Sequence, residues 1–143
     1  MESRLHLLLL EDDQQLRTAL ESLLVDEGYE VATAADGREA VAQAANQAPD
    51  ILLLDVKLPG PDGLEVLKQL KQQLPELQSL VMTGYASEED SIRAIRLGVG
   101  DYLQKPFPMA DFLQAVESLT RRALRLKALR EKEEVGALSQ VQT

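Results

Sequence analysis

The chain has 143 residues, the length of one domain, with 45% hydrophobic and 27% charged residues, an ordinary globular composition. Fifteen Lys and Arg against 24 Asp and Glu give a net charge of −9, which argues against direct nucleic-acid binding. The chain contains no cysteine, which excludes disulfides and zinc–thiolate sites. The longest apolar run, residues 7–10, is too short to span a membrane. We therefore expect an acidic domain of a reducing compartment, the cytoplasm.

Five short runs of predominantly apolar or β-forming residues have the length of strands and end at Gly, Pro, Asp or Ser. They cover residues 5–10, 29–33, 51–54, 77–82 and 101–104. The runs at 7–10 and 51–54 are apolar at every position, which predicts burial on both faces, as in a parallel sheet covered by helices.

The segments between these runs have helical periodicity and start signals. Leucines from 16 to 24 recur at three- and four-residue steps before Gly28, and a fifth helix opens near Pro108. Three pairs match the capping pattern: Asp36 with Glu39, Asp62 with Glu65, and Ser87 with Asp90. Strand and helix alternate five times, which predicts an α/β (βα)5 fold, a doubly wound five-stranded parallel sheet with helices on both faces. The strand order that we expect for this sheet is the flavodoxin-like order 2-1-3-4-5.

The last helix is predicted from about Met109 to Val135, on the order of 40 Å at 1.5 Å per residue. We expect it to project beyond the sheet after about Arg121, to stop at Gly136 and to continue as a tail or linker. The segment from Arg121 to Glu134 has six basic and three acidic residues, so it differs in charge from the acidic remainder. We therefore divide the chain into a domain at 1–120 and an extension at 121–143.

Charged and hydroxyl side chains follow four of the predicted strands. In an open α/β sheet, ligands bind beyond the carboxyl ends of the strands, and the order 2-1-3-4-5 makes strands one and three neighbours there. Asp13 is interpreted as a helix cap, which leaves Glu11 and Asp12 as the acidic pair after the first strand. The groups expected to converge are Glu11, Asp12, Asp55, Thr83 and Lys105.

Converging carboxylates need a cation, because two unit charges about 4 Å apart repel by roughly 4 kcal/mol at an effective dielectric near 20. Oxygen ligands favour a hard ion, and Mg²⁺ fits one or two carboxylates with a phosphate oxygen. Lys105 adds a fixed positive charge and Thr83 a hydroxyl. These groups suit phosphoryl transfer to Asp55, in which charge on the phosphoryl oxygens must be neutralised.

Four segments carry a family resemblance that covers roughly residues 4–120. They are LLLLEDD (7–13), ILLLDVKLPGPDG (51–63), VMTGYAS (81–87) and GVGDYLQKPF (98–107). Together, in this order and spacing, they resemble the receiver domain of a two-component response regulator of the CheY-like type. The resemblance implies that Asp55 is phosphorylated by a sensor histidine kinase or a phosphotransfer protein.

The resemblance also implies roles for individual residues. Asp12 and Asp55 would bind Mg²⁺, with Glu11 acting largely through water and the backbone carbonyl of Lys57 as a further ligand. Lys105 would contact the phosphoryl group and Thr83 would turn inward to bond it. Tyr102 matches an aromatic residue that changes rotamer with Thr83, and Lys105–Pro106 matches a cis peptide bond.

Each feature also has a simpler structural interpretation. Alone, Thr83 is ordinary strand material and Tyr102 is a packing residue. One alternative is a phosphohydrolase with an aspartyl nucleophile, but such enzymes of the haloacid-dehalogenase type have a second Asp where this chain has Lys57. A further alternative is an unphosphorylated scaffold that dimerises through its long helix.

The favoured interpretation is a switch that stores a signal as an aspartyl phosphate. Its activities would be self-phosphorylation and autodephosphorylation only. Output would pass through the surface formed by the fourth helix, fifth strand and fifth helix, either to an output domain after Thr143 or to a homodimer. The homodimer could also form through the C-terminal helix.

Overall fold

The computed structural model describes residues 5–84 and 87–142. Five parallel strands form one sheet in the order β2-β1-β3-β4-β5, which confirms the predicted topology. The strands are β1 (His6–Leu10), β2 (Glu30–Ala34), β3 (Ile51–Leu54), β4 (Gln78–Thr83) and β5 (Asp101–Gln104). The limits of all five agree with the predicted runs to within one residue, because each run has a clear apolar pattern.

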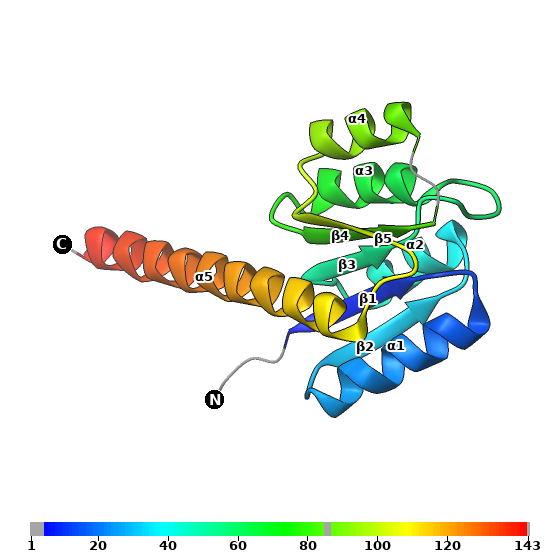
Figure 1. The fold of residues 1–143 in the computed structure, drawn as a ribbon. Helices are drawn as coiled ribbons and strands as arrows, with labels where there is room; N and C mark the ends of the chain where they lie inside the picture. Colours follow the sequence, from blue (N-terminus) through cyan, green and yellow to red (C-terminus); the bar gives the residue numbers. More distant parts are fainter. Residues whose placement is uncertain (1–4, 85–86, 143) are drawn as a thin grey trace.

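Five helices alternate with the strands. They are α1 (Gln14–Asp26), α2 (Gly37–Asn46), α3 (Gly63–Gln73), α4 (Glu88–Arg96) and α5 (Met109–Gln142). Residues of α1 and α5 pack on one face of the sheet, and residues of α2, α3 and α4 pack on the other. Figure 1 shows these two layers and the long α5, which continues well beyond the sheet.

The predicted capping residues begin their helices as expected. The side chain of Asp36 accepts a hydrogen bond from the backbone N–H of Glu39, and that of Asp62 accepts one from Glu65, both at 2.9 Å. Ser87 caps α4 in the same way. Asp13, the residue interpreted as a cap, accepts from the N–H of Leu16 at 3.1 Å. Each cap satisfies an N–H group that has no partner inside the helix.

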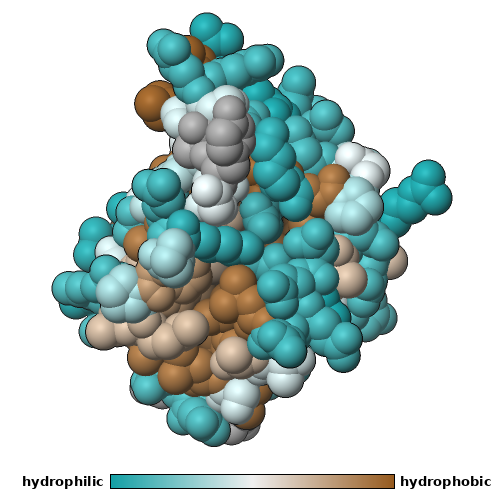
Figure 2. Space-filling view, turned by 45° about the vertical axis from the view of Figure 1, so that its right-hand side comes forward, coloured by the Kyte–Doolittle hydropathy of each residue, from teal (hydrophilic) through white to brown (hydrophobic). Residues whose placement is uncertain are grey.

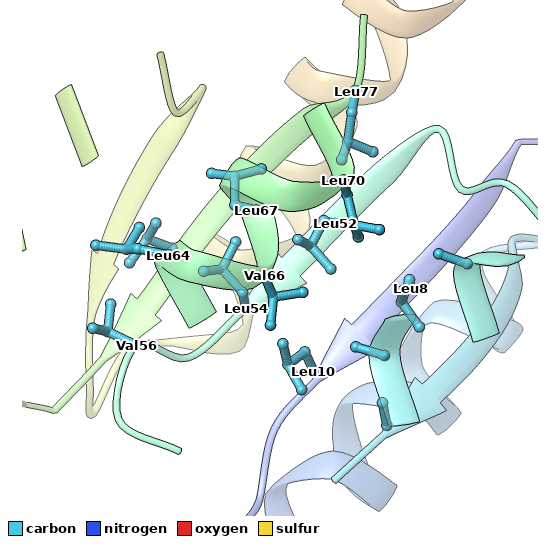
Figure 3. Packing of buried hydrophobic residues seen from close by; sticks show 14 of the residues in the cluster. Leu8, Leu10, Leu52, Leu54, Val56, Leu64, Val66, Leu67, Leu70 and Leu77 are labelled. Carbon is cyan, nitrogen blue, oxygen red and sulfur yellow. The ribbon is translucent and has the colours of Figure 1, made fainter. Parts of the chain in front are cut away.

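The central strands are buried on both faces. Side chains at alternating positions of β1 and β3 face the layer of α2, α3 and α4, among them Leu8, Leu10, Leu52 and Leu54 (Figure 3). The intervening leucines of these strands and Ile51 face α1 and α5 instead. The unbroken apolar runs therefore reflect helices on both sides of the sheet.

Helix α5 differs from its prediction at two places. It runs through Gly136 to Gln142, so the expected stop at Gly136 and the expected non-helical tail are wrong for the described residues. A glycine inside a helix costs only about 1 kcal/mol, which a long helix tolerates. The helix also leaves the body later than expected, because Ala123 is buried against the sheet.

Two ion pairs hold α5 at the opposite edge of the sheet from the strand ends that carry the predicted site. Lys127 contacts Asp50, which precedes β3, at 3.1 Å, and Arg130 contacts Glu76, which precedes β4, at 2.9 Å. We call these four residues the amino-edge cluster.

The face drawn in Figure 2 is mainly hydrophilic. Figure 2 shows one hydrophobic area in its lower half, in the part of the molecule where Figure 1 places α1 and the beginning of α5. Partly buried apolar residues here are Leu16 of α1, Phe107 just before α5 and Leu113 of α5. Among the residues described, no helix combines the length and hydropathy needed to cross a membrane.

Candidate functional site

Backbone pairing continues past the ends of the strands and fixes where the predicted site residues begin. The N–H of Glu11 donates to the carbonyl of Ala34, and the N–H of Asp55 donates to the carbonyl of Leu10, both at 3.0 Å. On the far side of β4, the N–H of Lys105 donates to the carbonyl of Thr83 at 2.8 Å. The three strand ends that carry Glu11, Asp55 and Lys105 therefore stop at the same edge of the sheet.

The side chain of Lys105 joins the two buried acids. Its Nζ donates to Oδ2 of Asp55 at 2.8 Å and also to Oε1 of Glu11. The remaining oxygens are held locally: Oε2 of Glu11 accepts from the N–H of Asp13, and Oδ1 of Asp55 accepts from the N–H of Lys57 at 3.2 Å. One ammonium thus serves two carboxylates.

Burial sets the electrostatics of this pair. Glu11 is fully buried and Asp55 is 6% exposed. Burial raises the pKa of Glu11, and the contact with Lys105 only partly opposes it. Burial acts against the charge of Lys105 as well, but its hydrogen bonds to Asp55 and Glu11 outweigh that effect and raise its pKa. Lys105 is therefore held as a cation at neutral pH.

Asp12 completes an acidic cluster that suits a hard cation. Carboxylate oxygens of Glu11, Asp12 and Asp55 lie within 4.8 Å of one another, with Asp12 exposed to solvent. We call these three acids with Lys105 the carboxyl-edge cluster. Three carboxylates against one ammonium leave negative charge uncompensated, and an all-oxygen donor set with one solvent-facing member suits a hydrated divalent ion.

Thr83 and Tyr102 lie on neighbouring strands at different distances from the carboxyl edge of the sheet. Thr83 is 1% exposed and ends β4, where it lies beside Gln104 of β5. Tyr102 lies beside Val81, two residues before the edge, and packs against the apolar cluster of α2, α3 and α4. Burial raises the pKa of its hydroxyl, which lies near Ser91 of α4. In this structure Thr83 therefore lies at the carboxyl edge with the charged residues, whereas Tyr102 lies two residues further from that edge.

The loop between β3 and α3 folds back onto the end of β3. A Cβ atom on Gly63 would lie 1.9 Å from the backbone oxygen of Asp55, so only glycine fits there. The N–H of Gly63 donates to the carbonyl of Val56. No signal in the local sequence predicts this close approach. On the other side of the site, the Lys105–Pro106 peptide bond is cis, as the resemblance implied.

A second charged group beside the site was not predicted. Lys57 contacts Asp90 of α4 at 3.3 Å, and Arg93 of α4 contacts both Asp90 and Asp62. Asp90 and Arg93 are three positions apart on one helix and so are neighbours by spacing, but Lys57 and Asp62 lie up to 36 positions from them, and no spacing pattern links the loop to α4. The other sequence signals were the helix caps that involve Asp62 and Asp90.

A doubly wound α/β domain with an acidic cluster and a lysine at its carboxyl edge has the architecture of a signal receiver. The comparison with protein families agrees: residues 7–117 match the model of the response regulator receiver domain. The chain therefore belongs to the response regulator receiver domain family, a family of two-component signalling. This membership favours the receiver interpretation over the phosphohydrolase.

Curated relatives are longer regulators. The chain is 38% identical over 117 residues to the alkaline phosphatase synthesis transcriptional regulatory protein PhoP of Bacillus subtilis, covering 82% of this chain and 49% of that protein. It is also 38% identical over 108 residues to the DNA-binding transcriptional regulator NtrC of Salmonella typhimurium, covering 76% of this chain and 23% of that protein. The chain thus spans about half or less of these two relatives.

Solved structures of similar size share the fold. The CheY-like receiver domain protein from Methanospirillum hungatei matches with a TM-score of 0.80 and 31% identity, covering 86% of this chain and 99% of that one. The receiver domain of a LuxO repressor protein from Vibrio parahaemolyticus matches with a TM-score of 0.81 and 28% identity, covering 90% and 98%.

Proposed function

We propose that Asp55 accepts a phosphoryl group from the phosphohistidine of a sensor histidine kinase or a phosphotransfer protein. A carboxylate oxygen of Asp55 attacks phosphorus, the new O–P bond forms while the P–N bond breaks, and the imidazole leaves and takes up a proton. The observation that carries this proposal is the bridge from Lys105 to both Asp55 and Glu11. This ammonium is already in place to neutralise the phosphoryl oxygens.

The acid cluster fits Mg²⁺. Asp12 and Asp55 would hold the ion directly, Glu11 largely through water, and the backbone carbonyl of Lys57 would complete the protein ligands. The support is the mutual distance of the three carboxylates and their uncompensated charge. Bound Mg²⁺ would neutralise negative charge on the transferred group. Water attack on the phosphorus would later release phosphate and restore the Asp55 carboxylate.

Output would use a shift between two populations rather than a new catalytic step. In this proposal Thr83 bonds the phosphoryl group and Tyr102 changes rotamer, which alters the surface formed by α4, β5 and α5. Two isoleucines of α4, Ile92 and Ile95, are 43% and 76% exposed and offer that surface apolar area for an output domain or a homodimer. The C-terminal part of α5 is the other candidate for dimer contacts.

The role within a larger protein is also a proposal. The relatives named above extend beyond the matched region, and one is a DNA-binding regulator. We therefore propose that residues 1–120 are a receiver unit, that 121–143 connect or dimerise it, and that it acts in the cytoplasm. Nucleic-acid contacts would belong to an output domain rather than to this acidic chain.

The test compares two aspartates at opposite ends of the same strand. Asp55 follows β3 and Asp50 precedes it. Purified wild type, Asp55→Asn and Asp50→Asn are incubated with a phosphorylated histidine kinase and Mg²⁺, and base-labile phosphate is measured. We expect phosphate on wild type and Asp50→Asn and none on Asp55→Asn, because an amide cannot form an acyl phosphate. Equal labelling of Asp55→Asn would overturn the assignment.

A further inference from the structure

Helix α4 is attached to both ends of the β3–α3 loop by four side chains of alternating charge. In spatial order they are Lys57, Asp90, Arg93 and Asp62. Lys57 lies near the start of the loop and Asp62 at its end, whereas Asp90 and Arg93 belong to α4. We call this group the α4 network. Its charges sum to zero, so unlike the carboxyl-edge cluster it needs no added ion.

Arg93 makes the strongest contacts of the network. Its two terminal nitrogens donate to the two carboxylate oxygens of Asp62 at 2.9 and 3.1 Å, and one of them also donates to Asp90 at 3.1 Å. Paired contacts of this kind define orientation as well as distance. Asp62 simultaneously caps α3 through the N–H of Glu65. The end of the loop is therefore fixed to two helices at once.

Lys57 is held at both of its ends. Its ammonium contacts Asp90, whose side chain is only 8% exposed, and its backbone N–H donates to Asp55. Asp90 in turn accepts from Arg93, so α4 acts on Lys57 through a buried carboxylate. The carbonyl that we assign to Mg²⁺ belongs to this same residue. Contacts from α4 therefore reach the residue whose carbonyl we assign to the metal.

We propose that Arg93 is a positioning residue that holds the β3–α3 loop in its metal-binding arrangement through Asp62, Asp90 and Lys57. The inference rests on the proposed function and extends it by linking the cation site to α4. A loop that is ordered before the ion arrives loses less conformational freedom on binding, which strengthens affinity. By reciprocity, the ion stabilises the present place of α4.

The experiment compares Arg93→Gln with Arg96→Gln, a change of an exposed arginine on the same helix. Mg²⁺ affinity is measured by calorimetry, and amide exchange is measured on the metal-free proteins. We expect Arg93→Gln to bind Mg²⁺ about fivefold more weakly, at the low end of known couplings between sites, and Arg96→Gln to match wild type. Amides of residues 56–62 should exchange faster in Arg93→Gln, while those of β1 and α1 keep their protection.

Asp62→Asn provides a second variant that keeps the helix cap, because Asn caps about as well as Asp. It should weaken Mg²⁺ binding in the same direction as Arg93→Gln, and the double variant should be no weaker than the stronger single one. Unchanged loop exchange or unchanged Mg²⁺ affinity in a folded Arg93→Gln would overturn the inference, as would faster exchange spread equally over the whole sheet. Failure of wild type to bind Mg²⁺ would refute the proposed metal site, and loop exchange would still decide whether Arg93 holds the loop.

Discussion

The two edges of the sheet use the same kinds of side chain with opposite results. At the amino-edge cluster, each acid has its own base: Asp50 with Lys127 and Glu76 with Arg130. At the carboxyl-edge cluster, three acids lie together, and one lysine contacts the two that are buried, Glu11 and Asp55. The paired charges at the amino edge hold α5 against the sheet. The excess negative charge at the carboxyl edge favours binding of a cation. Charge balance therefore separates the structural edge from the functional one.

The largest effect we expect comes from Gly63, because the carboxyl edge depends on its missing Cβ. Gly63→Ala places a carbon 1.9 Å from the backbone oxygen of Asp55, so the loop must move. We expect a loss of about 3 kcal/mol in the free energy of unfolding, the upper part of the usual range for overpacking. Gly136→Ala is the matched control: it has open space and lies inside α5, so it should stabilise by up to about 1 kcal/mol. Urea denaturation measures both, and equal stabilities would contradict the close approach.

Removing the ammonium of Lys105 should show the difference between the two edges most clearly. Lys105→Met leaves Asp55 and Glu11 without their counter-ion, and we expect metal-free stability to fall by about 2 kcal/mol, less than for a fully buried pair. Mg²⁺ should restore more stability in this variant than in wild type. Lys127→Met at the amino edge should lose at most about 1 kcal/mol, with no response to Mg²⁺. Thermal unfolding of both variants and wild type is measured with and without Mg²⁺. A similar Mg²⁺ response in Lys105→Met and Lys127→Met would contradict the difference between the two edges.

The raised pKa of Glu11 predicts an unusual pH dependence. Because the folded state binds this proton more tightly than the unfolded state does, Glu11 destabilises the metal-free protein at neutral pH. Its penalty should disappear as the pH falls through the raised pKa of the folded state towards the ordinary value of 4.5. Glu11→Gln should therefore be more stable at pH 7, on the order of 1 kcal/mol, and should lack this rise. If the free energy of unfolding of wild type and of Glu11→Gln changed with pH in the same way, the raised pKa of Glu11 would be contradicted.

The α4 network should show the opposite sign and a smaller effect. The pKa of Asp90 is lowered because its contacts with Ser87, Lys57 and Arg93 outweigh burial, and that of Asp62 is lowered chiefly by Arg93. Their stabilisation is present above the ordinary pKa of 3.8 and is lost as the pH falls through the lowered values. Arg93→Gln should lose less stability on acidification than wild type does. Acid titration followed by circular dichroism measures this difference, and an identical acid transition would contradict it.

The sequence was informative wherever one segment carries its own signal. Strand limits follow from apolar runs, and helix starts follow from caps such as Asp36 and Asp62. The strand-end residues could be grouped because sheet order alone places Glu11 and Asp55 on adjacent strands. Gly136 misled because a glycine is a weak stop signal when the helix on either side favours continuation.

Contacts between distant segments could not be read in this way. The pairing of Asp50 with Lys127 depends on the path of α5 across the amino edge, and that of Arg93 with Asp62 depends on how α4 packs beside α3. The close approach of Gly63 to Asp55 likewise appears only once the loop has folded back. Each of these contacts is a property of tertiary packing. The residue types permit the contacts, but the sequence does not predict which residues meet.

The central claim is that only the carboxyl edge of the sheet has excess negative charge and therefore binds a cation. Calorimetric titration with Mg²⁺ tests this claim most directly. Wild type and Asp50→Asn should each bind one Mg²⁺ per chain with the same affinity. The double variant Glu11→Gln, Asp55→Asn, in which Lys105 faces two neutral amides, should show no binding heat at the same concentrations. Equal heats from the double variant and wild type would place the ion elsewhere and contradict the account.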